Sequence, residues 1–332
     1  MKKSILAITA LTMMLASCSQ DETIDVTSRE AITFGNAFIE NATRAVDNSY
    51  KNEGFSAPFH VYGTITNKDD KTANIFNKEL VEKKNGNWVY NEANTQYWIP
   101  GNTYNFWAVV DGNIKGVSEV VANESDNYKP TQIKLLNALE QKDILWAKAE
   151  AISYDKGEKT VSFTFEHLMA KAIVAVKNEI ETNNGYTYKV KDITMSAVKS
   201  AIYDIATESW KEHKDKDALS FGNIGSAVTD IDTGEQAAVM IGFFEEKESA
   251  YARLLIPSSN NNKTNIELKF KFELYKDNIL IETGMKTAEA EATIKKGYAY
   301  KFLIKLGNPG EPIKFSVKTV KNWVDGNTEN LN

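Results

Sequence analysis

The strongest constraint on the fold is a run, residues 266–274, in which apolar and charged side chains alternate without a break. Successive side chains of a β-strand point to opposite faces, so this pattern predicts a strand with one buried and one solvent-facing side and excludes a helix. The apolar positions are Ile266, Leu268, Phe270, Phe272 and Leu274, and Glu or Lys fills each position between them.

Similar alternation recurs along the rest of the chain. It is present at Ile32/Phe34, Phe59/Val61, Tyr104/Phe106/Ala108/Val110, Val161/Phe163/Phe165, Tyr298/Tyr300/Phe302/Ile304/Leu306 and Ile313/Phe315/Val317. One solvent-facing side per strand favours antiparallel sheets over a buried parallel sheet. Turn residues agree with this reading, because Asn85-Gly86 between two apolar segments predicts a β-hairpin. Further turns are expected at Asp111-Gly112, Asn183-Asn184-Gly185 and Lys295-Lys296-Gly297. Residues 132–150 alone fit a helical stripe in part, and a short helix is expected there.

These patterns predict an all-β protein made of two antiparallel β-sandwich domains in series. A chain of 332 residues is long for one domain and sufficient for two of about 150. The polar segment Asp155-Lys156-Gly157-Glu158-Lys159 precedes a new strand, so the boundary is expected near residue 155. The predicted domains are therefore residues 45–155 and 156–332.

The start of the chain predicts export rather than folded structure. Lys2 and Lys3 precede an apolar segment, residues 5–15, that is too short to cross a bilayer, and small residues lead from it to Cys18. This arrangement resembles a bacterial lipoprotein signal with its lipobox. The resemblance implies cleavage between Ser17 and Cys18, loss of residues 1–17 and acylation of Cys18, which would anchor the protein in the outer membrane. The alternative is an ordinary secretory signal followed by an incidental cysteine.

The residues after Cys18 are polar and acidic and predict a flexible tether. Ser19-Gln20-Asp21-Glu22 resembles the surface-export signal of Bacteroidales lipoproteins, which would place the chain at the cell surface. The alternative is a solvated leader with no signalling role.

The chemistry of the chain gives little support to an enzyme. The three histidines are far apart, no metal-binding or nucleophile motif is present, and Asp230-Ile231-Asp232-Thr233-Gly234 does not match a calcium loop. We therefore expect no catalytic residue, no metal and no cofactor. The 45 Asp and Glu residues do not by themselves exclude a hydrolase, but nothing in the sequence places two of them across a cleft. The formal charge of −6 and the lack of a Lys/Arg cluster argue against nucleic acid as a partner.

Several local sequences, taken in order, resemble the fimbrillin family of Bacteroidales, whose members are lipoproteins that build proteinaceous fimbriae. They are Cys18 followed by Ile32-Thr33-Phe34 and Ala42-Thr43-Arg44-Ala45; Phe59-His60-Val61-Tyr62-Gly63; Gln96-Tyr97-Trp98; Tyr104-Asn105-Phe106-Trp107-Ala108; Phe163 to Lys171; and Pro312 to Val317 with Trp323-Val324-Asp325-Gly326. The resemblance implies two transthyretin-like β-sandwich domains, no enzymatic activity and a cell-surface location in fimbriae.

The resemblance also implies a mechanism of assembly. An arginine-directed protease cuts the lipidated precursor and frees an N-terminal strand, and a strand from another fimbrial subunit fills the vacated groove. In this chain the cut would fall between Arg44 and Ala45, because arginine is otherwise present only at Arg29 and Arg253. Residues 18–44 would then hold the tether and the cleavable strand, with Ile32, Phe34 and Phe38 on its buried face. The alternative for Arg44 is an ordinary exposed arginine.

Two points stay open at this stage. Ile313–Val317 or Val320–Val324 could be the strand that is donated, or either could complete the second domain.

The second function considered is a monomeric, surface-anchored glycan-binding lipoprotein. A fimbrial subunit could also bind a ligand on a host or bacterial surface. Glycan binding predicts that Trp88, Trp98 and Trp107 form an exposed row on which sugar rings stack, whereas tryptophan in an alternating β-protein more often lies in the core.

Overall fold

The structure, a computed structural model, describes residues 30–39, 55–154, 160–178, 185–221 and 252–320. Within these ranges the chain forms β-strands and a few single-turn 3₁₀ helices, so the all-β prediction is confirmed. The short helices are η3 (Glu92–Asn94), η4 (Glu124–Asp126), η5 (Ala138–Glu140) and η6 (Ser259–Asn261). None of the described helices is long or apolar enough to span a membrane.

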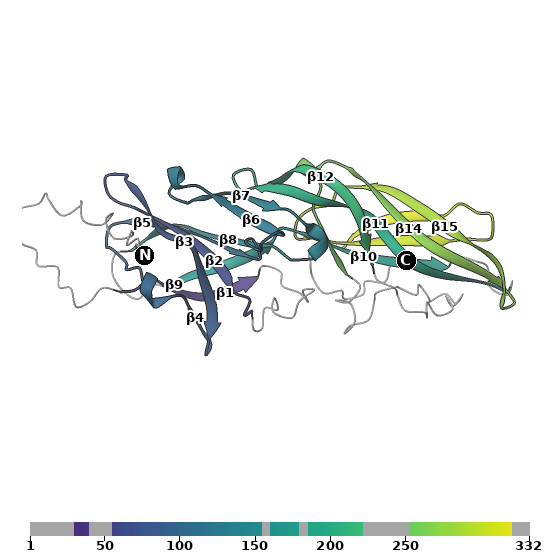
Figure 1. Ribbon diagram of the computed structural model, residues 1–332, viewed down its shortest axis with the longest axis horizontal. Coiled ribbons are helices and arrows are strands. Elements are labelled where there is room, and N and C mark those ends of the chain that lie inside the picture. Colours follow the sequence, from purple (N-terminus) through teal and green to yellow (C-terminus); the bar gives the residue numbers. More distant parts are fainter. Residues whose placement is uncertain (1–29, 40–54, 155–159, 179–184, 222–251, 321–332) are drawn as a thin grey trace, which may run out of the picture.

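The first half of the molecule is a closed β-barrel (Figure 1). Its strands are β1 (Thr33–Ile39), β2 (Phe59–Thr66), β3 (Thr72–Lys84), β4 (Asn87–Val89), β5 (Thr103–Val110), β8 (Leu145–Ser153) and β9 (Thr160–His167), in the spatial order β1-β4-β3-β2-β5-β8-β9. Phe59, Phe106, Phe163 and Phe165 are fully buried in the barrel core. Strand β9 pairs with β1 and closes the barrel, so β1 is the strand on which closure depends.

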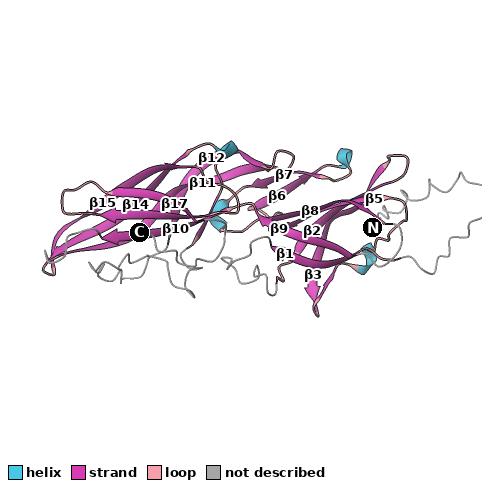
Figure 2. Cartoon of the chain, turned by 180° about the vertical axis from the view of Figure 1, so that it is seen from behind, coloured by secondary structure: helices cyan, strands magenta, loops and turns pink. Residues whose placement is uncertain are grey.

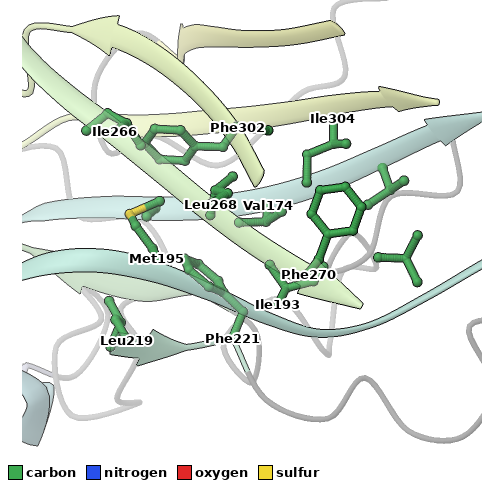
Figure 3. Close-up of a cluster of buried hydrophobic side chains, with 14 of the residues drawn as sticks. Val174, Ile193, Met195, Leu219, Phe221, Ile266, Leu268, Phe270, Phe302 and Ile304 are labelled. Atoms are coloured by element: carbon green, nitrogen blue, oxygen red, sulfur yellow. The ribbon is translucent and has the colours of Figure 1, made fainter. Parts of the chain in front are cut away.

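The second half is a two-layer sandwich. One layer has the order β13 (Arg253–Leu255), β10 (Ala170–Asn178), β16 (Ala299–Leu306) and β17 (Lys314–Val320). The other has the order β15 (Ile279–Ala292), β14 (Thr264–Lys276), β11 (Tyr186–Asp204), β7 (Pro130–Leu135) and β6 (Ser118–Ala122), with β12 (Ser209–Ser220) beside β11. Figure 3 shows the core between the layers, where Phe270, Leu268 and Phe302 lie with no measurable exposure.

The alternation in residues 266–274 is observed as predicted, because the apolar side chains of β14 are buried and those between them are not. The Asn85-Gly86 hairpin is also confirmed. Both residues have positive φ angles, 52° and 85°, and they join β3 to β4.

The expected helix in residues 132–150 is wrong. The chain there forms β7, the single turn η5 and the start of β8. Ile133 and Leu135 alternate with exposed or half-buried neighbours, and the Asn137 side chain accepts a hydrogen bond from Leu139 N at 3.3 Å and starts the short turn. Two strand patterns separated by a turn therefore resembled one helical stripe.

Two strand pairings depart from the expected antiparallel arrangement. Strand β1 runs parallel to β9, and β10 runs parallel to β16.

The strands of the barrel and of the sandwich alternate along the chain. Strands β6 and β7 precede residue 155 and pair within the sandwich, whereas β9 follows it and closes the barrel. The two-domain, transthyretin-like division at residue 155 stays a prediction.

The barrel and the sandwich meet where β9 passes into β10 through Leu168 and Met169. Leu168 N donates to Ile144 O at 3.0 Å, and the Trp210 indole donates to Leu168 O at 2.7 Å. His167 is buried here, with Nδ1 2.7 Å from Asp143 Oδ2. We call this region the junction.

Strand directions define the two ends of the elongated molecule (Figures 1 and 2). Strand β9 runs toward the junction, and β1, parallel to it, does the same. Strands β10 and β16 run away from the junction, and β17 is antiparallel to β16 and returns toward it. Strand β1 therefore begins at the outer end of the barrel, and β17 begins at the far end of the sandwich.

Candidate functional site

The candidate site is the position of β1 in the barrel, which we call the β1 seat. Its walls are β9 on one side and, on the other, β4 with the segment 96–98. Phe34 lies opposite Val161 of β9 and Trp88 of β4. The backbone continues the pairing before the strand begins, because Ile32 N donates to Gln96 O at 2.8 Å and Trp98 N donates to Glu30 O at 2.9 Å. Removal of β1 would leave the hydrogen-bonding groups of both walls without these partners.

Apolar packing fixes β1 from the inside of the barrel. Ile32 is fully buried and Phe34 is 4% exposed. The Phe34 ring lies 5.9 Å from that of Phe163 in a stacked arrangement and 5.7 Å from that of Tyr90, edge to face. It also contacts the rings of Phe76 and Phe106. Each such buried side chain contributes about 1.5–3 kcal/mol, so Ile32 and Phe34 are the main apolar anchors of the strand.

The expectation that Phe38 shares this buried face is wrong, because Phe38 is 48% exposed. The pairing of β1 with β9 shifts register between Phe34 and Ala37, which changes the faces of the residues that follow. Ala37, opposite Phe163, then packs against the core, and Phe38 lies opposite the exposed Thr164. The Gly35-Asn36 dipeptide was the available signal, since glycine inside a strand often marks such an irregularity.

Polar groups add specific contacts to the seat. The Tyr90 hydroxyl donates to Ile32 O at 2.9 Å, and the Tyr154 hydroxyl lies 2.5 Å from Glu30 Oε2. Burial raises the pKa of Tyr90, with a smaller contribution in the same direction from Glu79, so the hydroxyl keeps the proton that it donates. These two tyrosines thus hold Glu30 and Ile32, the residues that lead into β1.

Strand β17 is held in a different way. In the described part of the chain it pairs with β16 alone and forms the edge of its sheet. Its inward side chains Phe315 and Val317, and Ile313 just before it, are only partly buried. Behind it lies a hollow of about 560 Å³, lined by β15, β16 and β17, with Ala290, Tyr298 and Phe315 among the lining residues. Among the described residues, the core of the sandwich is therefore less completely covered on the side of β17 than elsewhere.

The segments that lead into β1 and β17 share a sequence pattern. Glu30-Ala31-Ile32-Thr33-Phe34 and Glu311-Pro312-Ile313-Lys314-Phe315 both have the form Glu-x-Ile-x-Phe, and the pattern occurs nowhere else in the chain. At β1, Glu30 makes the Tyr154 contact, and Ile32 and Phe34 are the two apolar anchors. In the connection that leads into β17, Glu311 instead accepts from Asn308 N and Nδ2 at 3.2 and 3.1 Å.

The other predicted site residues do not gather into a second site. Ser17, Cys18, Arg44 and Ala45 lie outside the described residues. The exposed row of tryptophans that glycan binding requires does not form, because Trp98 and Trp107 are each 3% exposed. Trp88 is half-buried against Phe55 and Phe59. Among the described residues, no group of three His, Cys, Asp or Glu side chains is placed to hold a metal ion.

The model of the fimbrillin-like family matches residues 43–323. Comparison with curated proteins gives no match. The fold is similar to the crystal structure of a fimbrial protein from Bacteroides vulgatus, with a TM-score of 0.63, 15% identity and coverage of 90% of this chain and 100% of that chain. A fimbrial assembly protein from Parabacteroides distasonis matches over 88% of this chain and 96% of that chain, with 10% identity and a TM-score of 0.39. At these identities the structural likeness to the first protein concerns the fold alone.

Proposed function

The chain belongs to the fimbrillin-like family, and from this premise we propose that it is a structural subunit of surface fimbriae that contributes to cell adhesion. The precursor is exported, acylated at Cys18 and anchored in the outer membrane. Proteolysis between Arg44 and Ala45 then releases β1, and a strand from another subunit takes its place. The protein has no catalytic role in this proposal.

The β1 seat carries the proposal. Strand β1 is joined to the barrel only through residues 40–58, which contain Arg44, so one cut makes the strand a separate peptide. Its departure opens the barrel and exposes the aromatic surface that packs on Phe34, together with the backbone groups of β9 and of residues 96–98. An open strand edge with an apolar groove is a template for an incoming strand.

We propose β17 of a second copy as the incoming strand. Its Glu-x-Ile-x-Phe pattern would set Ile313 and Phe315 in the positions of Ile32 and Phe34, and Glu311 opposite Tyr154. The apolar side chains of β17 are only half-buried in their own sheet, beside the hollow. In the seat they would become fully buried, and this gain opposes the cost of exposing β16 residues such as Phe302 when β17 leaves.

Strand direction is consistent with a linear fibre. A released β17 stays attached through residues 307–313 at the far end of the sandwich, because β16 ends there. A strand that keeps the polarity of β1 enters the seat at the outer end of the barrel. The far end of one copy thus faces the outer end of the next, which is a head-to-tail contact, and such contacts propagate into filaments when they do not close.

The first test is digestion of the purified precursor with an arginine-specific protease, followed by intact mass measurement and electron microscopy. We expect a cut after Arg44, loss of the N-terminal peptide and the appearance of fibres. The matched control is Arg44→Lys, which should stay uncut at this position and monomeric. A wild-type chain that is cut after Arg44, loses β1 and remains monomeric would refute the proposal.

A further inference from the structure

Exposed apolar side chains concentrate at both ends of the molecule. At the far end of the sandwich, the edge strand β15 exposes Ile279 by 69%, Leu280 by 50%, Ile281 by 49% and Met285 by 63%. We call these four residues the end patch. Three of them are consecutive at the start of the strand, so their side chains leave both faces of this hairpin end, and none of the three is buried. Exposed apolar side chains that gather in this way mark a contact site.

At the outer end of the barrel, Tyr97 is 43% exposed and Ile99 is 53% exposed. We call these two residues the barrel rim. They lie beside the entrance of the β1 seat, because Tyr97 forms a bridge with Ala31 and the intervening Trp98 N donates to Glu30 O. The rim is thus fixed next to the point where a new strand would enter.

The end patch lies beside the tether of β17. The hairpin that leads into the patch is held to the start of β11, since Asp277 N donates to Gly185 O at 2.8 Å and Tyr186 pairs with Lys276. Glu282 of β15 and Glu311 of the β16–β17 connection both act on Tyr188, whose pKa is raised mainly by burial and further by these two carboxylates. The patch and the tether therefore share one end of the sandwich.

We propose that the end patch of one copy packs against the barrel rim of the next copy and forms a second, strand-independent contact in the fibre. This inference rests on the proposed strand exchange, which brings the tether of one copy to the seat entrance of another. Since the patch lies beside the tether and the rim lies beside the entrance, the exchange that joins two copies also brings these two apolar surfaces together. The occupant of each surface is a second copy of this chain.

Mixed cross-linking of two single-cysteine variants tests the contact. The variants Ile99→Cys and Ile279→Cys are mixed, cut after Arg44, which also removes Cys18, and oxidised. We expect disulfide-linked dimers only in the mixture, whereas each variant alone should give none. Dimers from Ile279→Cys alone would indicate a tail-to-tail contact and overturn the inference.

A double variant supplies the functional readout. In Ile279→Ser/Leu280→Ser the lowest concentration that supports fibres should rise about tenfold, because two apolar side chains no longer contribute to the contact. Binding of a peptide of residues 309–320 to the cleaved seat should stay unchanged. The control is Leu136→Ser, which removes another exposed leucine, 43% exposed, from the junction side of the sandwich.

The outcomes separate this inference from the proposed function. Normal fibres without cross-links, and with an unchanged threshold in the double variant, would overturn the patch–rim contact and leave strand exchange standing. Failure of the wild-type chain to form fibres or to bind the peptide after cleavage would overturn both.

Discussion

Strands β1 and β17 carry the same Glu-x-Ile-x-Phe pattern and are held very differently. In β1, Ile32 is fully buried and Phe34 is 4% exposed, with ring contacts on several sides. In β17, Ile313 and Phe315 are only half-buried, and the Phe315 ring stacks on Phe302 at 6.4 Å beside an open hollow. The surroundings of the strand, rather than its sequence, therefore decide how tightly it is retained.

The largest expected effect comes from truncating the same ring in both strands. Phe34→Ala should lower the free energy of unfolding by about 3–5 kcal/mol, because it leaves a cavity in a closed aromatic core. Phe315→Ala should lower the free energy of unfolding by about 1–2 kcal/mol, because the ring is only partly buried and already borders the hollow. Denaturant titration of both variants measures the difference. Equal losses in the two variants would contradict the difference in packing between Phe34 and Phe315.

Removal of the Tyr90 hydroxyl should weaken the binding of β1 to the barrel without changing the apolar packing of β1. Tyr90→Phe loses the hydrogen bond to Ile32 O and should cost about 1 kcal/mol. After cleavage at Arg44, the β1 peptide should leave this variant several-fold faster, as followed by native mass spectrometry. Tyr97→Phe, which removes a hydroxyl from a side chain that is 43% exposed, is the control and should release the peptide at the wild-type rate.

Filling the hollow should make β17 behave more like β1. Ala290 faces the hollow from β15, and Ala290→Ile should stabilise β17 by about 0.5–1 kcal/mol. Hydrogen exchange of the β17 amides should slow, and fibre growth after cleavage should slow with it. Thr287→Ile, an exposed position on the same strand, should change neither rate. Faster growth in Ala290→Ile would contradict release of β17 as a step in assembly.

The smallest effect is expected at Phe38, which the sequence pattern groups with Ile32 and Phe34. Because its side chain faces outward after the register shift, Phe38→Ser should change the free energy of unfolding by less than about 0.5 kcal/mol. A loss comparable with that of Phe34→Ala would mean that the shift between Phe34 and Ala37 is absent in solution.

Much of the fold follows from local sequence, because a period of two fixes which residues of β14, β9 and β16 face the core. The closure of the barrel does not follow, since the parallel pairing of β1 with β9 joins residues far apart in the chain. The pattern predicts the wrong face for Phe38, because the register shift between Phe34 and Ala37 interrupts the alternation of faces along β1. The likeness of residues 30–34 to 311–315 was visible in the sequence, but its meaning depends on burial, which only the structure provides.

Cryo-electron microscopy of assembled fibres tests the exchange of β1 for β17 most directly, because the side-chain density shows which strand fills the β1 seat. We predict density for Ile313 and Phe315 of a neighbouring copy between β4 and β9, running from the outer end of the barrel toward the junction. A seat that still contains Ile32 and Phe34, or that is filled by a strand other than β17, would contradict the account.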